Sequence, residues 1–353
     1  MNCCSECFTS PHLKGIINSF ATIGDCDYCY SKQVSIYNPC ELNPIFQNIL
    51  GLYEVNPEVG SPIENKIEQD FTNKIFSQKV SDKRRELLQE IVADDYVSYQ
   101  ELFENPVVLS CTINASNDDK VKPLQITWER FEEEIKSVNR FHLQNLLDLD
   151  RLKSLLLPYK YIVSKGRKFF RARISSKIGF STSEMGHPPA DKTKPGRANP
   201  LGISYLYLAD QVTTTIYEAR ASLFDYVTIG EFRLKEDIKV INLRGNFYDP
   251  ITWADGEQQQ ELENILIHLP FISKLESTLS KPRRRDDNEL DYLPTQYLSE
   301  YIKSIGYDGV MFQSSLYSKG YNLAIFNPEK FECIKVNVFE IDNIEFKYTM
   351  LIT

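Results

Sequence analysis

Two Cys-x-x-Cys pairs near the N-terminus constrain the fold of this chain more than any other feature. Cys4 and Cys7 form the first pair, Cys26 and Cys29 form the second, and an 18-residue spacer separates them. Each pair turns tightly enough to point two sulfurs at one tetrahedral ion, and this spacing is typical of a four-thiolate zinc site. Four protein ligands leave no open position on the metal. The sequence therefore predicts structural zinc in a knuckle over residues 1–40.

Other interpretations of the N-terminal cysteines are a redox dithiol or a pair of disulfides. A redox Cys-x-x-Cys is expected beside a strand–helix pattern, and none is apparent here. Cys3 and His12 are possible substitute ligands, although neither fits the paired spacing as well. The remaining cysteines, Cys40, Cys111 and Cys333, are scattered, as expected of small buried hydrophobic residues in a reducing compartment.

Length and charge narrow the class of protein. A chain of 353 residues is expected to form two domains or more. Its net charge of −9 argues against a protein that mainly neutralises nucleic-acid phosphates. It contains no apolar run of the roughly 18 to 20 residues needed to cross a bilayer, and its first residues, MNCCSECF, lack the pattern of a secretory signal. We expect a cytoplasmic protein without a membrane partner.

Residues 41–160 have the spacing of amphipathic helices and predict a helical domain. Apolar residues recur every three or four positions in three runs: Ile63, Ile67, Phe71, Ile75 and Phe76; Leu87, Leu88, Ile91 and Val92; and Trp128, Phe131, Ile135 and Val138. Ser81 and Asp82 offer an N-cap for the second run, and Thr127 offers one for the third. These stripes predict helix packing rather than cofactor contacts.

Residues 161–353 change to short β-rich segments. KFFRARI, ISYLYLA, DYVTIGEFRL, KVINL, DGVMF and YNLAIF predict strands, and TTTIYEARASLF and LPTQYLSEYIKSIG predict helices. Strands with a few helices and no regular alternation indicate an α+β domain. The chain has no GxGxxG after a strand, no GxxxxGK[ST] and no GxSxG, which argues against Rossmann, P-loop and α/β-hydrolase sites.

A strand with two arginines is the first candidate for chemistry. In KFFRARI, the alternation of a strand places Phe169, Arg171 and Arg173 on the same face. Such a face is either a solvated edge or a cationic cradle for an anionic ligand, because guanidinium groups pair bidentately with phosphate oxygens. The segment alone leaves both interpretations open.

A loop, a strand and a helix supply the next candidates. Arg197 follows Gly196 in a loop rich in proline and glycine, where a fixed backbone suits an anion clamp. The strand ISYLYLA then places Tyr205 and Tyr207 on a common face. Glu218 lies in the following helix, where a glutamate can pair with a neighbouring arginine, face solvent or act in a site.

Together these segments resemble the RES domain, a family named for its arginine, glutamate and serine. The resemblance rests on FFRAR, GRANPLGISYLYLA, Glu218 and YDGVMFQSSLYSKGYNLAIF, which occur in order between about Arg167 and about Phe331. The cysteine pairs and following helices resemble a module that accompanies some RES domains and is described as HEPN-like. RES domains are similar in fold to ADP-ribosyltransferase toxins and act on NAD, so the resemblance implies a mixed α/β catalytic domain over residues 161–353.

The resemblance also implies which residues bind NAD. Arg171 and Arg197 match the two arginines of the family and would hold the pyrophosphate. Tyr207 matches its tyrosine and would bracket the nicotinamide ring. Arg173 lies outside the name-giving set and is a secondary candidate for NAD binding.

The glutamate and serine of the family would act at the ribose. Glu218 matches the glutamate, and Ser314 matches the serine, with Ser315 as the alternative because the doubled serine leaves the register open by one. Nicotinamide is a cationic leaving group, so its departure needs no general acid. An oriented carboxylate can stabilise the oxocarbenium-like ribose that remains.

The resemblance therefore implies an NAD-degrading enzyme that cleaves the nicotinamide–ribose bond by hydrolysis or phosphorolysis and serves as a toxin or phage-defence effector. A protein ADP-ribosyltransferase shares the first half-reaction and is the alternative. Expected partners are NAD, a protein antitoxin, trigger or ADP-ribosylation target, and further copies of the chain. A zinc-knuckle nucleic-acid-binding or RNA-cleaving protein is a further alternative, although the Arg-x4–6-His pair of HEPN ribonucleases is absent from the sequence.

Overall fold

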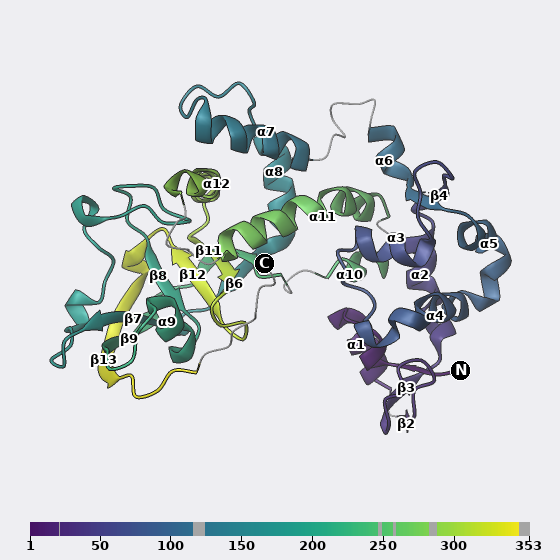
Figure 1. The fold of residues 1–353 in the computed structure, drawn as a ribbon, viewed down its shortest axis with the longest axis horizontal. Coiled ribbons are helices and arrows are strands. Elements are labelled where there is room, and N and C mark those ends of the chain that lie inside the picture. The colour runs from purple at the N-terminus through teal and green to yellow at the C-terminus, as the bar shows by residue number, and fades with distance from the viewer. Residues whose placement is uncertain (21, 116–123, 246–248, 257–258, 282–287, 346–353) are drawn as a thin grey trace, which may run out of the picture. The chain divides into compact units, whose positions relative to one another are not determined.

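The computed structural model describes residues 1–20, 22–115, 124–245, 249–256, 259–281 and 288–345 (Figure 1). The chain divides into two units: Met1–Glu129 with Tyr248–Ser273, and Arg130–Phe247 with Lys274–Thr353. Residues 248–273 thus group with the N-terminal unit, although they lie in the predicted catalytic domain. None of the described helices is long and apolar enough to cross a membrane.

The N-terminal unit combines two small sheets with short helices. Its strands are β1 (Cys3–Cys4), β2 (Ile23–Gly24), β3 (Val34–Tyr37), β4 (Tyr53–Val55) and β5 (Val107–Leu109), paired antiparallel in the order β1-β3-β2 and as β4-β5. Its helices are α1 (Pro11–Asn18), α2 (Asn43–Leu50), α3 (Ile63–Asp70), α4 (Arg84–Ile91), α5 (Tyr96–Glu104), α6 (Ser110–Ala115) and α10 (Ile251–Ala254). Helix α1 starts where the sequence favours it, because Ser10 accepts a hydrogen bond from the Leu13 amide and Pro11 occupies the first turn.

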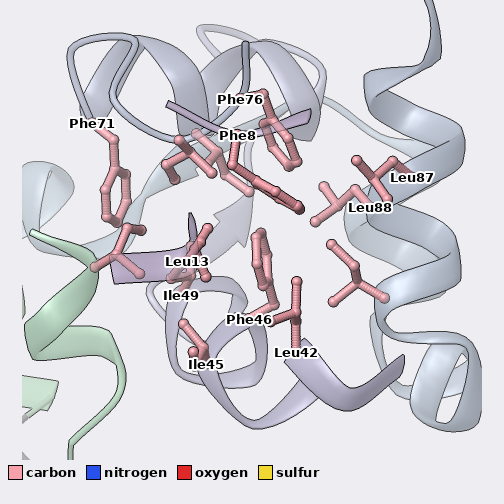
Figure 2. Packing of buried hydrophobic residues seen from close by; sticks show 14 of the residues in the cluster. Phe8, Leu13, Leu42, Ile45, Phe46, Ile49, Phe71, Phe76, Leu87 and Leu88 are labelled. Atoms are coloured by element: carbon pink, nitrogen blue, oxygen red, sulfur yellow. The ribbon is translucent and has the colours of Figure 1, made fainter. Parts of the chain in front are cut away.

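The core of this unit combines residues of two predicted apolar stripes with others outside them, such as Phe8 and Phe46. Phe8 and Phe46 both pack against Phe76, with ring centroids 5.7 and 6.0 Å apart, and Leu87 and Leu88 of α4 approach the same cluster (Figure 2). These five side chains are almost fully buried. Burial of a side chain of this size contributes roughly 1.5–3 kcal/mol, so this cluster stabilises the unit that carries the cysteines.

Two of the predicted helix caps are wrong. Ser81 and Asp82 lie inside a 3-10 helix that precedes α4, and the residue at the cap position is Lys83, which makes no side-chain capping bond. Helix α7 (Leu124–Ser137) begins before Thr127, which therefore lies within it. Val138 follows the end of α7 and is 71% exposed, so it does not continue the buried stripe.

The second unit contains an eight-stranded mixed sheet (Figure 1). Its strands are β6 (Lys160–Val163), β7 (Lys168–Ser175), β8 (Leu206–Ala209), β9 (Tyr226–Leu234), β10 (Ile238–Leu243), β11 (Gly309–Gln313), β12 (Tyr321–Ile325) and β13 (Phe331–Glu340). They lie in the order β13-β9-β7-β8-β12-β11-β10-β6, and all neighbours are antiparallel except β10 and β11. The α+β expectation is met by this arrangement.

Helices α8 (Leu149–Leu156), α9 (Val212–Ala219) and α12 (Leu293–Ser304) belong to the second unit, and helix α11 (Gln259–Ser280) begins in the first unit and ends in the second. One face of the sheet buries Phe169, Leu208, Phe232, Met311 and Leu323. The alternation of strands sends Tyr207 of β8, Phe312 of β11 and Asn322 of β12 to the other face, where they line the candidate site. Arg171 of β7 lies on the same face of its strand as Phe169 and lines the site where β7 separates from β8.

The sheet opens between β7 and β8. Strand β7 pairs with β9 along its whole length, but it pairs with β8 only at Phe170 and Ala209. Beyond this point the amide of Ala172 donates to Oγ1 of Thr215 in α9, at 2.6 Å. A side chain of α9 thus replaces a neighbouring strand as the partner of this backbone group, and the separated strands leave room for a cavity.

Candidate active site

A cavity of about 340 Å³ lies where β7 and β8 separate. Strands β7, β8, β11 and β12, helix α9 and the loop before β8 supply its walls. Four residues predicted from the sequence line it, namely Arg171, Arg197, Tyr207 and Glu218. Segments far apart in the sequence are thus brought together at one concave site, which is where ligands usually bind.

Glu218 is held at one of its two carboxylate oxygens. Its Oε1 accepts a hydrogen bond from Ser314 Oγ at 2.6 Å and another from Asn322 Nδ2 at 2.7 Å. Ser314 is 2% exposed and Asn322 is 9% exposed, so both donors are shielded from water. The other oxygen, Oε2, has no hydrogen-bond donor among the described residues, and Glu218 itself is exposed at the cavity wall. The carboxylate is oriented on one side and available on the other.

The end of α9 fixes where this carboxylate lies. The helix stops at Ala219 because Arg220 adopts a left-handed conformation with φ of 52°. Glu218 therefore lies in the last turn of α9. It bonds to a hydroxyl and an amide rather than to the neighbouring Arg220, which the sequence alone offers as a partner.

The loop after β11 places Ser314 against α9. The Ser314 amide donates to the Gly320 carbonyl at 3.0 Å, which closes the loop, and Ser314 Oγ accepts from the Tyr317 amide at 3.1 Å. A Cβ atom at Gly320 would lie 1.8 Å from Oγ1 of Thr214 in α9. Only glycine permits this close approach between the loop and the helix.

Ser315, the alternative for the family serine, lies outside this group. It is exposed, whereas Ser314 beside it is buried and bonded to Glu218. The two serines differ because consecutive residues at the end of β11 point in different directions. The geometry therefore favours Ser314 over Ser315 as the serine of the family motif.

Arg171 contributes a half-buried positive charge to the cavity. Its Nη1 donates to the Gly186 carbonyl at 3.0 Å. Burial, together with the nearby charge of Arg173, lowers the pKa of Arg171 to about 10. The guanidinium therefore stays protonated near neutral pH, in a setting where its charge is poorly screened by water.

Arg173 does not reach the cavity. Its Nη1 donates to the Glu184 carbonyl at 2.5 Å, and its guanidinium carbon lies 4.1 Å from the centroid of the Phe180 ring. Its side chain thus binds the loop that follows β7. Of the two arginines predicted on one face of this strand, only Arg171 lines the cavity.

The loop that carries Arg197 is held by side chains of α12. Thr295 Oγ1 donates to the Arg197 carbonyl at 2.6 Å, and Gln296 Nε2 donates to the carbonyls of Gly196 at 2.8 Å and Asn199 at 3.1 Å. Thr295 and Gln296 are both buried. These bonds fix the backbone of Arg197 before any ligand binds, which is the preorganisation that an anion clamp needs.

Tyr207 uses its hydroxyl to hold the same loop. The hydroxyl donates to Asn199 Oδ1 at 2.8 Å and accepts from the Ala198 amide at 3.3 Å. Burial raises the pKa of Tyr207, so the phenol stays protonated and remains a donor. Tyr205, predicted on the same face, instead packs against Phe326 with ring centroids 4.8 Å apart.

Asn322 is the site residue that the sequence prediction misses. A signal was present: the strand YNLAIF places an amide between apolar residues, at a position whose neighbours along the strand are buried. A buried polar group requires a hydrogen-bond partner, so an asparagine there indicates a specific contact. That contact is Glu218.

The four predicted cysteine ligands form a second candidate site, in the N-terminal unit. The Sγ atoms of Cys4, Cys7, Cys26 and Cys29 all lie within 4.8 Å of one another. Neighbouring sulfurs are 3.4 Å apart between Cys4 and Cys29 and between Cys7 and Cys26, and 4.0 Å apart between Cys4 and Cys7. A tetrahedral ion with Zn–S distances near 2.3 Å separates its sulfurs by about 3.8 Å. All four cysteines are free, so the geometry fits a metal ion and not disulfides.

The two substitute ligands lie elsewhere. Cys3 Sγ donates to the Tyr37 carbonyl at 3.5 Å, across the β1–β3 pair. Nε2 of His12 lies 2.6 Å from Oδ2 of Asp255. The paired cysteines alone therefore make up the ligand set among the described residues.

Comparisons with known proteins agree with the location of the cavity. The family model of the RES domain matches residues 168–349, which is more than half of the chain and includes all strands that line the cavity. The chain therefore belongs to the RES domain family. No curated protein matches it. The model does not reach residues 1–167, so the resemblance of the N-terminal part to a HEPN-like module stays a prediction.

Among solved structures, a chain in the crystal structure of the M. tuberculosis MbcT–MbcA toxin–antitoxin complex is similar to this protein. The two chains are 12% identical, with a TM-score of 0.31, and the match covers 54% of this chain and 91% of the other. A likeness this remote carries no argument about activity.

Proposed function

We propose that this RES domain degrades NAD by cleaving the bond between nicotinamide and ribose. The observation that carries the proposal is the Glu218 carboxylate, which is oriented through one oxygen and lines a cavity together with Arg171 and Arg197. A negative charge beside two positive charges suits a substrate with a cationic ring and an anionic pyrophosphate.

The reaction needs stabilisation of positive charge at the ribose. When the bond between C1′ and the ring nitrogen breaks, its electron pair leaves with nicotinamide, which becomes neutral, and the positive charge develops on the ribose. Glu218 would stabilise that charge through Oε2, a role supported by the bonds from Ser314 and Asn322 that orient the carboxylate through Oε1. Water then forms the new bond to C1′ and releases one proton, which gives ADP-ribose.

The arginines and the tyrosine bind the remainder of the substrate. Arg171 and Arg197 hold the pyrophosphate, since each guanidinium offers several donors to phosphate oxygens. The Tyr207 hydroxyl is engaged by Asn199 and Ala198, so only its ring is available to pack against nicotinamide.

A product analysis tests this function. Purified protein is incubated with NAD, with and without inorganic phosphate, and the products are identified by mass spectrometry. Hydrolysis gives nicotinamide and ADP-ribose, phosphorolysis gives a phosphorylated ADP-ribose only when phosphate is present, and an ADP-ribosyltransferase labels a protein. Absence of nicotinamide release under all these conditions would refute the proposal.

We propose that the N-terminal cysteine cluster holds structural zinc. The donor set consists of four thiols with the spacing and separation of a tetrahedral site, which is the chemistry that zinc prefers. Bound zinc would cross-link β1, the turn after β2 and the 3-10 helix that contains Cys7, and so stabilise the part of the N-terminal unit that carries the cysteines.

In cells, we propose that this enzyme acts in the cytoplasm as a toxin or phage-defence effector and is restrained by a protein antitoxin or awaits a trigger. NAD loss arrests metabolism, so an unrestrained NAD-degrading enzyme is harmful to its host. Expression of the wild-type chain should lower cellular NAD and stop growth, whereas a Glu218→Gln variant should do neither.

A further inference from the structure

A second cavity, of about 160 Å³, adjoins the candidate active site at Arg197. Both cavities count Arg197 among their walls. The second one is otherwise built from charged and polar side chains of α7, α11 and the segment that leads into α12, including Glu132, Lys136, Lys281 and Asp291. It lies wholly within the second unit of the chain.

The guanidinium of Arg197 is directed to this second cavity. Its Nη1 donates to the Thr278 carbonyl at 2.8 Å, and its central carbon lies 5.5 Å from the centroid of the Tyr292 ring. Thr278 and Tyr292 line the second cavity and not the first. A phosphate that binds this guanidinium therefore leads a ligand out of the first cavity and toward the second.

The sizes of the cavities indicate how a dinucleotide divides between them. A volume of about 340 Å³ is at the lower end of the range for drug-sized ligands, roughly 300–1,000 Å³, and a dinucleotide with two bases, two riboses and a pyrophosphate is larger than most of them. With the nicotinamide ribose at Glu218, the first cavity accommodates only that half of the molecule. We propose that the second cavity is the subsite for the adenosine half of NAD, an inference that rests on the proposed function.

The side chains that line the second cavity suit the adenosine half of NAD. The amino group of Lys281 is exposed and has no ion-pair partner among the described residues, so it can bind the phosphate next to the adenosine. Lys136 lies between two carboxylates, 2.8 Å from Glu132 and 3.1 Å from Asp291, and holds both at the cavity wall. A carboxylate that accepts hydrogen bonds from ribose hydroxyls is the usual means by which dinucleotide sites recognise the adenosine ribose.

The same carboxylates predict selectivity for NAD over NADP. The 2′-phosphate of NADP would meet Asp291 and Glu132, whose negative charges repel it, while Lys136 between them offsets part of this repulsion. Glu132 and Lys136 precede the segment that the RES family model matches. Helix α7, outside the family domain, thus contributes to substrate choice.

ADP, which lacks nicotinamide and its ribose, is the probe for this subsite. Calorimetry measures its binding to the full chain, and kinetics measure its competition with NAD. Lys281→Glu reverses the free charge and should weaken ADP binding at least about tenfold, as expected for loss of a charge-assisted contact. Lys235→Glu is the matched control, because Lys235 is exposed between β9 and β10 and lines neither cavity. It should leave ADP binding unchanged.

A second variant, Asp291→Asn, should raise kcat/KM for NADP relative to NAD by about two- to fivefold, because it removes an exposed charge that repels the 2′-phosphate. The inference is overturned if wild-type protein does not bind ADP at millimolar concentration, or if Lys281→Glu binds ADP as tightly as Lys235→Glu. If ADP binds in a Lys281-dependent way but NAD is not cleaved, the proposed function fails while the nucleotide subsite stands.

Discussion

The pair Ser314 and Ser315 allows a test in which one variant controls for the other. Ser314→Ala removes the 2.6 Å bond to Glu218 Oε1, whereas Ser315→Ala alters an exposed neighbour that makes no contact with that carboxylate. A hydrogen bond to a charged group contributes about 1.5–3 kcal/mol. If this bond orients Glu218 in the transition state, kcat should fall about ten- to a hundredfold in Ser314→Ala, since 1.4 kcal/mol corresponds to a factor of ten.

The effect of Ser314→Ala on catalysis should be a fall in kcat rather than a change in KM. Asn322 still donates to Oε1 in the Ser314 variant, so the carboxylate stays near its position and KM for NAD should change little. Ser314→Ala also removes the acceptor of the Tyr317 amide, which costs about 1 kcal/mol of stability and lowers Tm by a few degrees. Release of nicotinamide is the assay, and thermal unfolding followed by circular dichroism is the check on folding. Loss of activity in Ser315→Ala with normal activity in Ser314→Ala would refute this assignment.

Two further predictions concern the arginine and the metal. Arg171→Ala should weaken NAD binding about ten- to a hundredfold, through loss of a charge-assisted contact, while Tm falls by no more than the few degrees expected for loss of the bond to the Gly186 carbonyl; an unfolded variant would show that Arg171 is structural instead. Metal analysis should give about one zinc per chain, and Cys26→Ser should lose the metal and lower the stability of the N-terminal unit. Metal-free protein with the same Tm as the purified protein would contradict the zinc assignment.

The sequence predicts much of the sheet but not all of it. Six strands follow from their alternation and turn signals, and β7 is found nearly to the residue because Phe170, Ala172 and Ile174 alternate with Arg171 and Arg173. Strand β13, at the edge of the sheet, is not predicted, although Ile334, Val336 and Val338 alternate with Lys335 and Asn337 as residues of a strand do. Helix α11 is not predicted from the sequence because Pro270 lies inside it, and an internal proline normally indicates that a helix ends.

Most of the candidate site can be predicted from local sequence motifs, but residues whose role depends on a contact distant in sequence cannot. Arg171, Arg197, Tyr207 and Glu218 are predicted from motifs and line one cavity. Asn322 is not predicted, because its importance depends on a contact across 104 positions of sequence that only the pairing of β12 with β8 brings about. The secondary candidate Arg173 does not line the cavity, and its guanidinium instead binds the Glu184 carbonyl in the loop that follows β7.

Glu218→Gln tests the central claim most directly. The variant keeps the shape of the side chain and an oxygen that can accept from Ser314 and Asn322, but it removes the negative charge. The loss of one preorganised electrostatic group typically reduces the rate about a hundred- to a thousandfold. We therefore expect nicotinamide release to fall by that factor, while calorimetry still detects NAD binding to a folded protein. A Glu218→Gln variant that releases nicotinamide at close to the wild-type rate would contradict the mechanism.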